Sequence, residues 1–218
     1  MATLTARLTP KSVATRAKLV SVAEMLFALR GVEGVSLKDI AQAARQRHSN
    51  ACQYHFGSKD NLIQAILDKH VPGIVARRNA LFDAMEGTRA IRPEQVVEAF
   101  VRPVADKLFD ADGGKEFLQI NAGLVALHAL AASEPGNSRY VIPGQPRLMR
   151  HLGAIVPRRA SDSVIRNRLM MAGIMLFHGL ADFSRLLDHS SRPHGRPETE
   201  AFVTELEAMI LAVLTAPL

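Results

Sequence analysis

A cluster of polar side chains between positions 47 and 53 can form hydrogen bonds with the edges of nucleic-acid bases. Arginine pairs well with guanine in the major groove of DNA, and asparagine or glutamine pairs well with adenine. The candidates for base contact are Arg47, His48, Ser49, Asn50 and Gln53. Side chains read a base sequence together only when one rigid element presents them, so the flanking residues must supply that element.

Neighbouring residues can bind phosphate oxygens, which would fix the register of such an element on a duplex. The candidates are Lys38, Tyr54, His55 and Lys59, with Ser36 contributing its hydroxyl or the N-terminus of the helix that it begins. Packing against the preceding helix, without DNA contact, is the alternative for this group. We prefer packing for Phe56, weigh both roles equally for His55, and prefer phosphate contact for Tyr54 and Lys59.

Two short helices are predicted to position these side chains. Ser36 can cap the first, and Asp39 lies three residues later, where its carboxylate can complete a capping box. Apolar residues at helical spacing extend this helix over 36–44, and a polar turn follows at 45–48. A second helix is predicted over 50–55 and ends at Gly57. Two short helices with a tight turn, the second polar and basic, form a helix-turn-helix, whose second helix enters the major groove.

This stretch resembles the DNA-binding domain of the tetracycline-repressor-like (TetR) family. The matching residues are Phe27, Gly31, Val35, Ser36, Ile40, Ala41, Ala44, the run 54–59 (Tyr-His-Phe-Gly-Ser-Lys) and Leu62. The turn is one residue longer than usual, and Gln53 occupies the usual tyrosine position. The resemblance covers about residues 12–70 and implies a repressor with an N-terminal DNA-binding domain and a divergent C-terminal ligand-binding domain.

Net charge is concentrated in the same region. The chain of 218 residues has a formal net charge of +6, and 48% of its residues are hydrophobic. Residues 1–60 contain nine lysines and arginines and four acidic residues, so they carry +5 of this charge. A merely solvated basic face is the alternative, but the charge together with the helix-turn-helix favours double-stranded DNA as the partner.

The remaining bulk features indicate a cytoplasmic protein. The single cysteine, Cys52, excludes an intrachain disulfide and suits a reducing compartment. A small buried residue is a more natural role for it than a redox sensor. The N-terminus lacks the apolar region of a secretion signal. The longest strongly apolar run, 169–177, is shorter than the ~20 residues of a membrane span, so we expect no membrane partner.

Helical periodicity continues to the C-terminus, and the predicted fold class is all-α. Helices are expected over 58–85, 93–109, 116–132, 146–155, 161–187 and 198–215, with loops at 133–145 and 190–197. Pro72-Gly73 should kink or stop the first of these helices, which makes it a candidate hinge. We expect a helix-turn-helix domain over 1–57 and a helical ligand-binding and dimerisation domain over 58–218.

Polar residues within the apolar C-terminal helices are candidates for ligand binding. They are Asn121, His128, Met175, His178 and Asp182. His178 and Asp182 are four residues apart and share a helix face, which would suit two metal ligands. No third ligand is identifiable, so a hydrogen bond in a ligand pocket or an interface is preferred. A satisfied core histidine is at least as good an interpretation of His128.

The chain contains no catalytic motif that we recognise, and no cofactor or metal is expected. We therefore expect a non-enzymatic, ligand-responsive regulator that binds a palindromic operator as a homodimer and is released by an apolar small molecule. The run 169–177 is apolar on all sides, which favours burial by a partner copy. The alternatives are a constitutive or architectural DNA-binding dimer with a solid core, and a helical enzyme.

Overall fold

A computed structural model describes residues 9–87, 90–133, 140–189 and 195–218, without the side chains of 126–133 and 145. Within these ranges the chain forms helices and no strand, which confirms the all-α fold class. The elements are α1 (Pro10–Arg30), α2 (Leu37–Ala43), α3 (Ala51–Phe56), α4 (Lys59–Glu86), α5 (Pro93–Ala105), η1 (Asp106–Phe109), α6 (Gly114–Ser133), α7 (Gln145–Ile155), α8 (Asp162–His189) and α9 (Arg196–Thr215).

The predicted helix-turn-helix is present and begins with the expected capping box. The Ser36 hydroxyl accepts a hydrogen bond from the Asp39 amide at 3.2 Å, and the Asp39 carboxylate accepts one from the Ser36 amide at 2.9 Å. Hydrogen bonds from the hydroxyl and amide of Ser36 hold the pKa of Asp39 below its ordinary value. Gly57 ends α3 with φ at 75°, a left-handed conformation that glycine adopts without strain.

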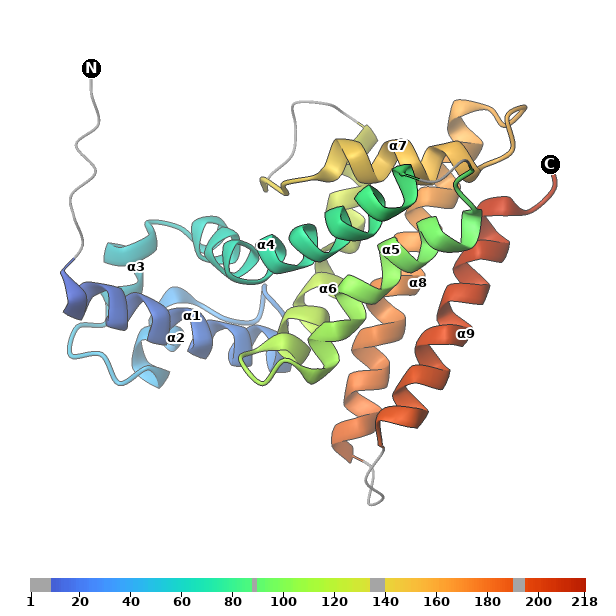
Figure 1. The fold of residues 1–218 in the computed structure, drawn as a ribbon. Helices are drawn as coiled ribbons and strands as arrows, with labels where there is room; N and C mark the ends of the chain where they lie inside the picture. Colours follow the sequence, from blue (N-terminus) through green and yellow to red (C-terminus); the bar gives the residue numbers. More distant parts are fainter. Residues whose placement is uncertain (1–8, 88–89, 134–139, 190–194) are drawn as a thin grey trace.

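Helix α4 connects the two ends of the molecule (Figure 1). Its N-cap, Ser58, follows α3 directly, and the helix packs against α1 and α3 before it reaches α5 and α6. Pro72 lies inside the helix, which continues through it instead of stopping. Because proline has no amide hydrogen, the hydrogen-bond ladder lacks one bond at this point, so α4 is weakened near its middle.

A buried carboxylate joins α1 to α4. Glu24 of α1 is 1% exposed, and its two oxygens lie 2.8 Å from Nε2 of His70 and 2.8 Å from Nζ of Lys69. A Cβ atom at Gly113 would lie 2.5 Å from the Glu24 carboxylate, and the φ of 81° also favours glycine there. The turn before α6 is therefore fitted around this charged group.

Helices α8 and α9 lie at the end of the molecule opposite α1–α3 (Figure 1). Helix α8 packs against α6 and α9. By length and composition it would also be able to cross a membrane. One such helix is weak evidence for a membrane span, because a core helix passes the same test, so it does not overturn the expectation based on the shorter run 169–177. The helix is amphipathic in its packing, because buried residues such as Leu176 and Leu180 alternate with exposed ones such as Met171 and His178.

Burial of Cys52 predicts a pH-dependent contribution to stability. The side chain is fully buried, and burial raises the pKa of the thiol from 9.0 to about 11. The folded state favours the protonated thiol, so this stability is complete below pH 9.0 and is lost as pH rises towards about 11. The free energy of unfolding, measured by urea titration across this range, should fall more steeply for the native protein than for Cys52→Ala. Parallel pH profiles for the two proteins would contradict this prediction.

Candidate DNA-binding surface and ligand cavity

The predicted base-contact residues form one exposed surface. Arg47, His48, Ser49 and Asn50 lie in the turn before α3, and Gln53 lies on α3; all five are exposed. Tyr54 is 86% exposed, although it is a large aromatic residue. An exposed tyrosine beside exposed cationic and amide side chains suits contact with an anionic polymer better than core packing.

Helix α3 is only six residues long, so its position depends on contacts with other helices. Cys52 and Phe56 are buried on its inner face. Arg16 of α1 donates a hydrogen bond to the carbonyl of His55 at 2.8 Å, and its guanidinium lies 4.2 Å from the Phe56 ring centroid. These contacts fasten the C-terminal end of α3 to α1. Phe56 packs against the rest of the protein, which is the role preferred for it from the sequence. Arg16 stabilises the position of α3.

The phosphate candidates differ in how free their side chains are. Ser36 and Lys38 are exposed at the start of α2, and Lys38 makes no hydrogen bond or ion pair within the described ranges. Lys59 instead donates a hydrogen bond to the carbonyl of Val32 at 2.9 Å and so supports the turn between α1 and α2. His55 is half-buried. Lys38 is therefore the cation most available to a phosphate in this group.

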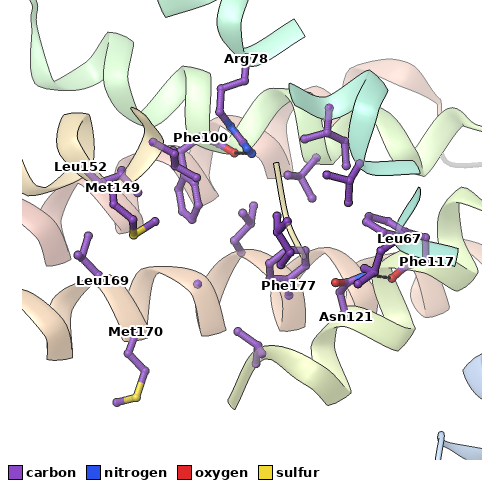
Figure 2. Close-up of a pocket in the computed structure, with 18 of the residues that line it drawn as sticks. Leu67, Arg78, Phe100, Phe117, Asn121, Met149, Leu152, Leu169, Met170 and Phe177 are labelled. Atoms are coloured by element: carbon purple, nitrogen blue, oxygen red, sulfur yellow. Dashed lines mark hydrogen bonds between the residues drawn. The ribbon is translucent and has the colours of Figure 1, made fainter. Parts of the chain in front are cut away.

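An apolar cavity of about 400 Å³ lies between α4, α5, α6, α7 and α8. Figure 2 shows its walls, which include Phe100, Phe117 and Phe177. The cavity is in the size range of small-molecule sites, which are lined mainly by apolar side chains with a few polar groups that fix orientation. Among the described side chains, the polar ones at this cavity are Arg78, Asn121, Arg166 and Asn167.

Asn121 lies at the cavity, as expected for a ligand-binding residue. It is 3% exposed, and its amide nitrogen donates a hydrogen bond to the Phe117 carbonyl at 2.8 Å. The amide oxygen makes no hydrogen bond within the described part of the chain and can therefore accept one from a ligand. The side chain of His128 lies outside the described residues.

Met175, His178 and Asp182, which were also predicted to bind a ligand, lie away from this cavity. None of the three is in the cavity lining, and His178 and Asp182 are exposed. The reason is the helical period. Residues 166, 169, 170, 173 and 177 line the cavity from one face of α8, and 171, 175, 178 and 182 fall on the opposite face. The described residues also contain no cluster of three potential metal ligands.

Arg78 is a polar residue of the cavity that was not predicted from the sequence. It occupies one position among the buried residues of α4, which also include Leu67, Val71, Ile74, Phe82 and Met85. A charged residue within an apolar helical stripe is a signal that can be read from the sequence, because buried charges are rare without a specific role. Arg166 and Asn167 were also missed; both are exposed at the N-terminal end of α8.

The electrostatic environment of Arg78 is unusual. The residue is 8% exposed, and burial lowers the pKa of its guanidinium to about 10. Arg78 therefore remains protonated at neutral pH. Nε donates to the Ala99 carbonyl at 3.2 Å, and Nη2 lies 3.5 Å from the Phe100 carbonyl. Among the residues that the structure describes, no carboxylate lies within ion-pair distance of it. Figure 2 shows the side chain extending from α4 towards the space among the labelled residues.

Comparisons with known proteins agree with the helix-turn-helix. Residues 19–66 match the family described as bacterial regulatory proteins, tetR family. No curated protein sequence matches the chain.

Solved structures similar to this chain include a ketosteroid transcriptional regulator of Mycobacterium tuberculosis, with 18% identity, a TM-score of 0.48 and coverage of 97% of this chain and 100% of that chain. A TetR-family regulator from Thermus thermophilus has 20% identity, a TM-score of 0.47 and coverage of 92% and 99%. One from Mesorhizobium loti has 15% identity, a TM-score of 0.46 and coverage of 94% and 98%. The match over residues 19–66 and the capped, exposed helix-turn-helix identify the N-terminal part of this chain as similar to the DNA-binding domain of the bacterial regulatory proteins of the tetR family.

Proposed function

We propose that this protein is a cytoplasmic, ligand-responsive transcriptional repressor. It binds a palindromic operator as a homodimer, and an apolar small molecule in the cavity releases it from DNA. The observation that carries the proposal is the combination of an exposed, basic recognition surface with a separate apolar cavity. Helix α4 connects the two, because it packs against α3 and also lines the cavity. In domain terms, residues 1–57 bind DNA and residues 58–218 bind the effector and the partner copy.

The recognition surface supports a sequence-specific role for α3. Arg47, Asn50 and Gln53 supply the donors and acceptors that read purines in the major groove. Arg16 and Phe56 hold α3 against α1 on its buried side. The exposed side chains of α3 and of the turn before it therefore project from a fixed element. Lys38 at the start of α2 can neutralise a phosphate beside the same groove.

The cavity favours effector control over constitutive binding. A constitutive DNA-binding dimer needs no space in its core, and interiors are normally close-packed. A cavity of about 400 Å³ with aromatic walls is more than a packing defect and matches the size of a small-molecule site. A helical enzyme remains the other candidate, but the described side chains that line the cavity, including Asn121 and Arg78, offer binding groups and no nucleophile or general base.

The outer face of α8 supports the dimer. Met171 is 45% exposed and Leu186 is 64% exposed, and both lie on the face that carries His178 and Asp182. Met209 of α9 is 54% exposed. A second copy packed against these helices would cover this apolar surface, and the polar pair His178 and Asp182 would then supply interface hydrogen bonds.

Helix α4 supplies a physical link between the cavity and α3. Leu67, Val71 and Ile74 line the cavity on both sides of Pro72, whereas Ser58 at the N-terminus of the helix adjoins α3. Gln64 of α4 also makes two hydrogen bonds with the backbone of Val141, at 2.9 and 3.0 Å. Because Ile142 is in the cavity wall, a ligand that displaces this wall would pull on α4 near its DNA-proximal end.

Selection of bound sequences from a random DNA pool tests the proposed function directly. We expect an inverted repeat, because each copy in a two-fold dimer contacts one half-site. Light scattering of the free protein at micromolar concentration should give the mass of two chains. An absence of sequence enrichment would contradict the DNA-binding role, and the mass of one chain would contradict the homodimer.

Two substitutions that remove the same charge separate base reading from phosphate contact. Arg47→Ala should weaken operator binding by about 1–3 kcal/mol and relax specificity at one base pair. Lys38→Ala should weaken binding equally on all sequences and reduce its salt dependence by about one counterion. Fluorescence anisotropy at several salt concentrations, with operator and scrambled DNA, distinguishes these patterns. Identical effects of Arg47→Ala on both DNAs would remove it from the base contacts.

Substitution of Gln64 tests the link from cavity to DNA. Gln64→Ala removes both hydrogen bonds to Val141 but no cavity-lining side chain. It should therefore leave effector affinity within about threefold of the native value and reduce the effector-induced loss of operator affinity, which is a coupling free energy between two sites. Gln64 Nε2 also donates a hydrogen bond to Asp68 at 2.8 Å, so Asp68→Ala is the control that removes this bond and keeps both bonds to Val141. If Gln64→Ala retains the full coupling, the contact with Val141 does not transmit the signal.

A further inference from the structure

Arg78 is a buried charge whose partner is missing from the described chain. Its guanidinium lies at the cavity wall and remains protonated at neutral pH. Buried charges are normally paired, because removal from water is costly unless an opposite charge or several hydrogen bonds compensate. The ion pairs of neighbouring cations illustrate the contrast. Arg77 pairs with Asp106 at 2.8 Å, and Arg102 pairs with Glu200 at 2.8 Å.

A structural role accounts for only part of the Arg78 side chain. Pro103 lies inside α5 and has no amide hydrogen, so the carbonyl of Ala99, four residues earlier, lacks its usual donor. Nε of Arg78 supplies that hydrogen bond at 3.2 Å. This contact fixes the position of the guanidinium. It uses one of five N–H groups, and the Nη2 contact with Phe100 is long, at 3.5 Å.

The remaining N–H groups define the chemistry of a ligand. Nη1 makes no hydrogen bond within the described ranges, and the cavity next to the guanidinium is otherwise lined by groups such as Phe100, Val104 and Phe177. A planar guanidinium with free terminal nitrogens matches the two oxygens of a carboxylate, which accept two parallel hydrogen bonds. The aromatic and aliphatic walls match an uncharged, apolar body.

We propose that the effector is an apolar carboxylic acid, bound as the carboxylate, whose oxygens accept hydrogen bonds from Nη1 and Nη2 of Arg78. This assignment rests on the proposed function in taking the cavity as the effector site. The acid would enter with its body against Phe100, Phe117 and Phe177, and its charge would complete the ion pair that the folded chain leaves open. Arg166 lies at the exposed side of the same cavity and is solvated without a ligand.

Paired acids and alcohols test the carboxylate requirement in the native protein. Isothermal titration calorimetry at neutral pH compares dodecanoate with dodecanol and naphthoate with naphthol, so that each pair shares one apolar body. At least one acid should bind about tenfold or more tightly than its alcohol, because a charge-assisted bidentate contact is lost in the alcohol. If every alcohol binds as tightly as its acid, or if neither acid binds, the assignment is overturned.

Two substitutions locate the charge. Arg78→Met should weaken binding of the preferred acid by about tenfold or more and leave the alcohol within about threefold. Arg166→Met removes the same charge from the exposed side of the cavity and should change acid affinity by less than about threefold. Equal losses in the two variants would overturn the assignment to Arg78.

Folding and DNA binding are measured on the same samples. Arg78→Gln is the second variant, because it keeps an N–H donor for the Ala99 carbonyl but removes the charge. Thermal unfolding of each variant identifies any general loss of structure. Operator binding distinguishes the two levels of failure. Normal operator binding without a preference for acids overturns the carboxylate and leaves the regulator proposal intact, whereas absence of specific DNA binding overturns the regulator proposal.

Discussion

The buried carboxylate of Glu24 is the interaction on which the arrangement of the two ends of the molecule depends. It joins α1, which supports the recognition helix, to Lys69 and His70 of α4. Burial opposes the charge on Lys69, but hydrogen bonds to Glu24 and Asp112 outweigh it and raise the Lys69 pKa. A buried carboxylate without these partners would be strongly unfavourable, so the contacts with Lys69 and His70 favour the packing of α1 against α4.

This attachment defines how a ligand can act on DNA. The part of α4 before Pro72 is tied to α1 through Lys69 and His70, and the part after it carries Arg78 and Phe82 into the C-terminal core. Any movement of α4 at the cavity must therefore carry α1 and α3 with it or be absorbed at Pro72. A ligand releases DNA only if it binds one arrangement of α4 more tightly than the other. Two arginines have different roles: Arg16 stabilises the position of α3, and Arg78 faces the cavity.

The sequence was sufficient to predict the local elements of the DNA-binding surface. The pair Ser36 and Asp39 and the pair Gly57 and Ser58 are local signals, each within four residues, and each pair marks a helix boundary in the structure. The exposure of Gln53 follows from such a short helix, which has only one face to bury, and Arg47 is exposed in the turn before it. The continuation of α4 through Pro72 was not predictable in the same way, because packing on both sides outweighs the loss of one hydrogen bond.

The ligand site was less predictable, because a cavity is formed by helices that are distant in sequence. Asn121 was identified as a polar residue in an apolar helix, and it does line the cavity. His178 and Asp182 are also polar residues in an apolar helix, but they face away from the cavity. No sequence pattern within α8 predicts which face of the helix lies towards α4 and α6. Arg78 was detectable from its place in an apolar stripe. The lack of a charged partner for Arg78, however, could be recognised only from the packing of α5, including Pro103, beside it.

Because α4 both lines the cavity and packs against α3, we expect occupation of the cavity to change the spacing of the two recognition helices in a dimer. Double electron–electron resonance can measure this spacing, because the sole native cysteine is buried and an exposed Gln42→Cys label on α2 reports the position of each helix-turn-helix. Distances should be compared between the operator complex and the protein saturated with the tightest-binding acid. The account predicts two distinct distance distributions. Identical distributions in a protein that has released its operator would contradict it.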